Sequence, residues 1–172
     1  MITQNMQTAI NEQINAELWS AYLYLSMSLD AGAKALKGVS NWFFVQWLEE
    51  QDHARIFQKY LEDQGARVEL KPIDGVTSEW DTPLDMYKDA LRHEKEVTDM
   101  IYNLVRLALR EQDFATLSRL LWFVDEQVEE EKSAADLVEE FEKARKDCSI
   151  MRDVDKSLEE REYRRAEPLE TK

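Results

Sequence analysis

The sequence predicts an all-α fold, a four-helix bundle with one long crossover connection and a short fifth helix near the C-terminus. Three observations support this prediction. The 172 residues include only 4 Gly and 3 Pro, which are too few turn residues for a β-sandwich or barrel. Apolar residues recur at alternating spacings of three and four along four long segments, as a bundle core requires. Two of the links between these segments are short, and the middle link is long.

Capping and turn residues mark the ends of the first helices. The first helix is expected over about residues 5–30, and the second between a suitable N-cap, Ser40, and a suitable C-terminal stop, Gly65. Thr82 can cap the third helix, with Pro83 at its first position.

The later part of the chain is divided in the same way. A break at residues 112–113 separates the third helix from the fourth, a fifth helix is expected over residues 149–164, and the chain after Pro168 is expected to fray. Residues 1–165 therefore form one predicted bundle domain, followed by a charged tail over residues 166–172.

The connection lengths predict the topology. Each short link makes its two helices an antiparallel hairpin. The middle link has about 18 residues and can stretch to about 60 Å, whereas a helix of roughly 25 residues is about 38 Å long. The link can therefore cross the whole bundle, which makes the second and third helices parallel.

Charge and cysteine content limit the possible functions. The net charge of −14 argues against nucleic acid and anionic membranes as partners and favours cations, although an acidic surface alone often only keeps a protein soluble. The single cysteine excludes an intrachain disulfide framework and a four-cysteine metal site. No secretory signal and no apolar run of membrane-spanning length is visible, so we expect a cytoplasmic protein.

Polar residues interrupt every apolar stripe near its middle. They are Glu17, Glu50, Glu94, Gln127 and Glu130, with His53 one turn after Glu50 on the same face. A buried, unpaired carboxylate costs several kcal/mol or takes up a proton. Glu17 alone is readily explained as a side chain that reaches water, but four helices with the same feature need a common compensating cation.

A constant shift of 77 residues relates the two halves of this set. It maps Glu17, Glu50 and His53 onto Glu94, Gln127 and Glu130. Two hairpins related in this way face each other about a pseudo-twofold axis, so their polar residues converge. A Glu from each of two helices with Glu-x-x-His from the others is the general pattern of di-iron carboxylate bundles. Here the fourth helix has Gln-x-x-Glu instead.

The donor set favours iron. Four carboxylates and one imidazole form a hard, mainly oxygen site without thiolate. Zinc usually takes fewer ligands with more nitrogen or sulfur, and calcium rarely binds His. Manganese or a mixed metal pair stays open on ligand type.

Several stretches resemble the non-haem ferritins of bacteria and archaea over nearly the whole chain. They are NEQINAE at 11–17, AYLY at 21–24, EEQDH at 49–53, SEWD at 78–81, HE at 93–94 and EQVEEE at 126–131. The resemblance implies a ferritin-like fold and an iron-storage protein. It would oxidise Fe(II) with O₂ or H₂O₂ at a di-iron ferroxidase centre within each subunit and store ferric oxyhydroxide in a homo-oligomeric shell, expected to have 24 subunits.

The resemblance also implies roles for individual residues. Glu17, Glu50 and His53 would hold one iron, and Glu50 would bridge to a second held by Glu94 and Glu130. Gln127 would contact the site or its bound oxygen, and Tyr24 would either supply an electron or only bond to a carboxylate. A possible third iron site would use Glu49, Glu126 and Glu129 together with Glu130, although these residues could equally be a solvated helix face.

Three further expectations come from the same resemblance. Asp52 stands where a haem-binding relative would have Met, so no haem is expected. His93 is expected to be a partly exposed residue beside the site rather than a ligand, and Trp122 is expected near the site. The fifth helix is much more charged than in the family, which leaves the shell contacts and pore open. A peroxide-reducing di-iron protein and a metal-binding cage without oxidase activity remain as alternatives.

Overall fold

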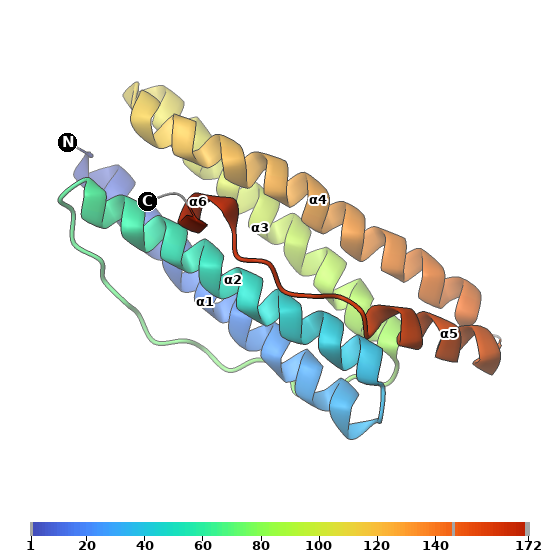
Figure 1. The fold of residues 1–172 in the computed structure, drawn as a ribbon. Coiled ribbons are helices and arrows are strands. Elements are labelled where there is room, and N and C mark those ends of the chain that lie inside the picture. Colours follow the sequence, from blue (N-terminus) through green and yellow to red (C-terminus); the bar gives the residue numbers. More distant parts are fainter. Residues whose placement is uncertain (1, 146, 171–172) are drawn as a thin grey trace.

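The protein is a four-helix bundle, seen here in a computed structural model that describes residues 2–145 and 147–170. The long helices are α1 (Gln4–Ala33), α2 (Lys37–Asp63), α3 (Pro83–Glu111) and α4 (Phe114–Ala144). Helix α1 packs along α2 and α3 along α4, while α1 also contacts α3. The link over residues 64–82 follows the length of the bundle, so that α2 and α3 run parallel (Figure 1). The predicted all-α bundle with one crossover is confirmed.

Most of the predicted helix ends are also confirmed. The Thr82 hydroxyl accepts a hydrogen bond from the Asp85 amide (3.2 Å), and Gly65 follows α2 with a φ of +68°, a conformation that glycine adopts without strain. Ser40 is not an N-cap, because α2 already begins at Lys37. Its hydroxyl instead donates to the Ser28 carbonyl on α1 (2.8 Å), which ties the two helices together.

The core consists of two apolar clusters, one toward each end of the bundle. One cluster is centred on the stacked rings of Phe43, Tyr87 and Phe141, and the other on the stacked pair Phe57 and Phe123. On each long helix the interrupting polar residue lies between the residues of one cluster and those of the other. The polar centre is therefore enclosed on both sides by packed side chains.

The predicted stripes agree closely with the buried residues. One exception is on α2, where the spacing of three and four from Phe43 to Glu50 predicts Trp47 in the core, but Trp47 is only partly buried and Gln46 is fully buried in its place. This exchange brings one more polar side chain into the interior.

The C-terminal region differs from the sequence expectation. Helix α5 (Cys148–Leu158) ends six residues earlier than predicted, and residues 159–166, here called the C-terminal strap, run back along α2 (Figure 1). The strap is not helical because its polar groups bond to α2 rather than to each other. Nor does the chain fray from Pro168, since α6 (Glu167–Glu170) follows and Leu169 packs against the core. Within the part of the chain that the structure describes, no helix is both long enough and apolar enough to cross a membrane.

Candidate metal centre

The six interrupting residues are all buried and lie together in the middle of the bundle. They are Glu17, Glu50, His53, Glu94, Gln127 and Glu130, each at most 6% exposed. Ligand atoms of Glu17, Glu50 and His53 lie within 4.8 Å of one another, and so do those of His53, Glu126 and Glu130. Because His53 belongs to both groups, the two sets of possible ligands adjoin each other.

Glu17 projects from α1 with one oxygen held and the other free. The Gln13 side chain, one helical turn earlier, donates to Oε1 (3.0 Å). Oε2 is buried and has no hydrogen-bond partner among the described residues. Burial, followed by the neighbouring charge of Glu50, raises the pKa of Glu17 to about 8. A bound cation would satisfy the free oxygen and reverse this shift.

Glu50 and His53 lie one turn apart on α2. The His53 Nδ1 is 3.3 Å from Glu50 Oε2, and the imidazole edge packs against the rings of Trp122 and Phe123. Burial and the charge of Glu94 raise the pKa of Glu50 well above its ordinary value. The aromatic rings therefore fix the direction of the imidazole, while the carboxylate beside it lacks a full countercharge.

Glu94 on α3 has hydrogen-bond donors on both carboxylate oxygens. The Tyr24 hydroxyl donates to Oε1, and the Gln127 amide donates to Oε2 (3.2 Å). Gln127 is itself held by the Glu94 carbonyl and by the Thr98 hydroxyl, both at 3.3 Å. Burial, followed by the charge of Glu130, still raises the pKa of Glu94 to about 8.

The cluster carries more negative charge than the protein compensates. In the described part of the chain, no Lys or Arg forms an ion pair with any of the four core carboxylates, Glu17, Glu50, Glu94 and Glu130. Buried carboxylates either bind protons or need a cation. Oxygen donors with a single imidazole fit a hard or intermediate divalent metal such as Fe²⁺. The arrangement can therefore hold such a cation in exchange for protons.

Comparisons with known proteins agree with this geometry. A family model described as a ferritin-like domain matches residues 7–144. This chain belongs to the ferritin family. A bacterial non-heme ferritin of Bacteroides fragilis is 40% identical over 144 residues, which are 84% of this chain and 91% of that protein. The corresponding protein of Staphylococcus haemolyticus is 32% identical over 163 residues, which are 95% of this chain and 98% of that protein.

Solved ferritin structures have the same fold. An open pore ferritin from the hyperthermophilic archaeon Archaeoglobus fulgidus is 44% identical, with a TM-score of 0.93 over 94% of this chain and 100% of that chain. An engineered closed form of that ferritin gives a TM-score of 0.94 over 95% of this chain and 100% of its own. The predicted non-haem ferritin, with iron storage and ferroxidase activity, is confirmed at the level of the family.

The residues predicted for a third iron site in this ferritin are in different surroundings. Glu126 lies beside His53 and Glu130, whereas Glu129 is exposed. Glu49 forms an ion pair with Arg161 of the C-terminal strap (2.6 Å). Burial raises the pKa of Glu49 to about 7, even though the Arg161 charge acts in the opposite direction. Glu49 is therefore paired with a basic side chain of the strap, whereas Glu129 faces solvent.

Two ring side chains, Tyr24 and His93, lie near the centre, and His93 is buried rather than partly exposed as the sequence predicted. Tyr24 is fully buried against Phe43 and bonds to Glu94. His93 is buried beside the ligands, with its Nε2 2.7 Å from the Ser20 hydroxyl and its ring against Trp19. Burial lowers the pKa of His93 to about 4, so this imidazole is neutral near pH 7.

Sequence reasoning missed two buried amides of the centre. Gln46 donates from Nε2 to Glu130 Oε2 (2.9 Å), as Gln13 does to Glu17. Both amides lie one helical turn before a ligand of their own helix, Gln46 before Glu50 and Gln13 before Glu17. That spacing is the signal that could have identified them.

Proposed function

We propose that this ferritin oxidises Fe(II) at the buried cluster and stores the ferric product. The observation that carries the proposal is the group of four buried core carboxylates, joined by His53, for which the ion pairs of the described residues include no Lys or Arg partner. Two adjacent Fe²⁺ ions would neutralise this charge. Together they can deliver the two electrons that reduce O₂ to peroxide.

Each ligand has a proposed role. Glu17 and His53 hold one iron, Glu94 and Glu130 hold the second, and Glu50 bridges the two. The free Oε2 of Glu17 and the contact between Glu50 and His53 support the first part of this assignment. Gln127 would orient Glu94, and Tyr24 would supply an electron to the site; the hydrogen bonds of both side chains to Glu94 support these roles.

The remaining proposals concern the wider molecule. We propose a homo-oligomeric shell of 24 subunits, a cytoplasmic location, and two strongly bound iron ions per subunit, with Glu49, Glu126, Glu129 and Glu130 as the residues available to a weaker third. No haem is proposed, because Asp52 is buried and accepts hydrogen bonds from Arg55, Tyr163 and the Ala166 amide.

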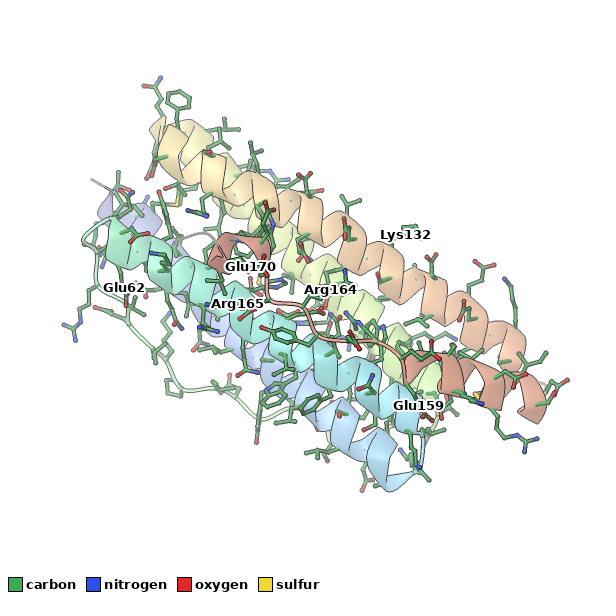
Figure 2. All side chains as sticks on the ribbon, in the orientation of Figure 1. Glu62, Lys132, Glu159, Arg164, Arg165 and Glu170 are labelled. Atoms are coloured by element: carbon green, nitrogen blue, oxygen red, sulfur yellow. The ribbon has the colours of Figure 1, made fainter. Side chains whose placement is uncertain are left out.

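Aerobic addition of Fe²⁺ to the iron-free protein tests the function. We expect rapid appearance of the ferric absorption band and a particle whose mass and iron content grow with repeated additions. His53→Ala should slow the rapid phase at least about tenfold, because a lost ligand misplaces both metals. Glu62→Ala, at an exposed position on the same helix (Figure 2), is the control.

Other outcomes would replace the proposal. Oxidation with H₂O₂ but hardly with O₂ would indicate a peroxide-reducing di-iron protein. Iron binding without oxidation would indicate a metal-binding cage. A rate for His53→Ala equal to that of Glu62→Ala would remove the cluster from the reaction.

A further inference from the structure

The C-terminal strap lies over the part of α2 that carries the metal centre. Figure 2 shows Glu159, Arg164 and Arg165 along it in this order, on the side of α2 that faces the viewer. The strap begins where α5 touches the start of α2. There the Val39 amide donates to Asp155 Oδ1 (2.9 Å), and a Cβ on Gly38 would lie only 1.5 Å from the Asp155 carbonyl oxygen.

The far end of the strap is held by a buried carboxylate. Asp52, 1% exposed, accepts hydrogen bonds from the Tyr163 hydroxyl (2.6 Å) and the Ala166 amide (3.1 Å). Between these anchors, the Asn41 side chain donates to the Arg161 carbonyl (2.9 Å). The backbone on both sides of Arg161 is therefore fixed to α2.

The Arg161 guanidinium fills a defined position between these anchors. It lies over the ring of Trp42, 4.7 Å from the centroid, and donates to the Trp42 carbonyl (3.2 Å). One of its nitrogens donates both to Gln46 Oε1 and to Glu49 Oε2, the latter at 2.6 Å. Gln46 in turn donates to Glu130. A permanent positive charge thus bonds one carboxylate directly and reaches a proposed iron ligand through one amide.

We propose that Arg161 determines how many cations the centre takes, because its guanidinium occupies the cation position at Glu49. This inference rests on the proposed function, since it takes Glu130 as an iron ligand. A guanidinium is charged at every relevant pH, and its planar donors match a carboxylate better than an ammonium does. A third iron that used Glu49 would have to displace Arg161, whose other contacts hold it in place. The strap therefore favours two ions per chain over three.

Titration of the iron-free protein with Fe²⁺ in the absence of O₂ tests this inference. We expect two strongly bound ions per chain in the wild type. Arg161→Ala should bind a third ion about tenfold more tightly than the wild type does, because the partly buried Glu49 carboxylate has lost its countercharge. Arg161→Lys, which keeps the charge but not the planar donors, should show a smaller increase. Arg164→Ala, at an exposed position on the strap, is the matched control and should not differ from the wild type.

Two further variants locate the effect. Glu49→Gln combined with Arg161→Ala should return the third ion to wild-type affinity. Gly38→Ala should loosen the strap without changing Arg161 and also strengthen the third ion, whereas Gly75→Ala, with no atom within 4 Å of its added Cβ, should not. Cleavage of the strap by a protease checks that it has been released.

The inference and the proposed function fail in different ways. A wild-type chain that binds no Fe²⁺ would overturn the proposed function. Two strong ions in the wild type, with a third ion equally weak in Arg161→Ala, would overturn the role of Arg161 alone. If the double variant Glu49→Gln, Arg161→Ala still binds the third ion as tightly as Arg161→Ala does, the proposed role of Arg161 is also wrong, because that ion does not then bind at Glu49.

Discussion

The two hairpins of the bundle each bring three side chains to the metal centre, but they hold them differently. In the first hairpin, Glu17 has a buried oxygen without a partner. In the second, Tyr24 and Gln127 donate to both oxygens of Glu94. Residues that correspond by sequence spacing are therefore not equivalent in chemistry. In the first hairpin a ligand atom of Glu17 is free to bind a metal. In the second hairpin hydrogen bonds already fix the Glu94 carboxylate before any metal binds.

The largest expected effect comes from comparing two corresponding positions, Glu50 and Gln127. Glu50→Ala should slow the first rapid oxidation of Fe²⁺ at least about tenfold, because it removes the proposed bridge. Gln127→Ala should slow it only about threefold, since Glu94 keeps its bond from Tyr24. Stopped-flow absorbance measures both rates. If both variants lost the same fraction of the oxidation rate, the two hairpins would contribute equally and this prediction would be wrong.

A second comparison uses two buried tyrosines. Tyr24→Phe removes a donor from Glu94 and should slow oxidation about threefold. The matched control is Tyr87→Phe, because the Tyr87 hydroxyl is buried without a partner in the described part of the chain. Its removal should leave the rate unchanged and raise the free energy of unfolding by up to about 1 kcal/mol. If both variants oxidise iron as fast as the wild type, the Tyr24 hydrogen bond does not matter for the reaction.

The raised pKa values predict a dependence of stability on pH. Glu17 and Glu94 have pKa values of about 8 in the folded chain and an ordinary value of 4.5. Between these values the folded state binds protons that the unfolded state has released. The stability they contribute is therefore complete below pH 4.5 and is lost as the pH rises toward 8. Each group changes the free energy of unfolding by at most about 1.4 kcal/mol per pH unit.

Denaturant unfolding of the metal-free protein at a series of pH values between 5 and 8 measures this dependence. Glu17→Gln should weaken it, because the amide does not titrate, whereas Glu12→Gln at an exposed position on α1 should not. Bound Fe²⁺ should also reduce it by replacing the protons. A wild-type profile that Glu17→Gln leaves unchanged would contradict the raised pKa of Glu17.

The spacing of residues by itself determined the bundle and the six central residues. Stripes of period three to four, each interrupted by polar residues near its middle, specify which face of a helix is buried and where along the helix the polar centre lies. Because one long link and two short ones allow a single simple arrangement, Glu17, Glu50, Glu94 and Glu130 had to converge. Local signals also sufficed for Thr82 and Gly65, whose roles depend on their immediate neighbours.

Only the tertiary structure decided the features that depend on contacts between distant segments. The sequence predicts a helix for the first residues of the C-terminal strap, and nothing in their local sequence shows that Asp52 and Glu49 on α2 bind them. The same applies to the start of α2, which is bonded by Asp155 rather than capped by Ser40. Sequence periodicity reports which side of a helix is apolar. A hydrogen bond between residues more than a hundred positions apart depends on where the folded chain places both partners.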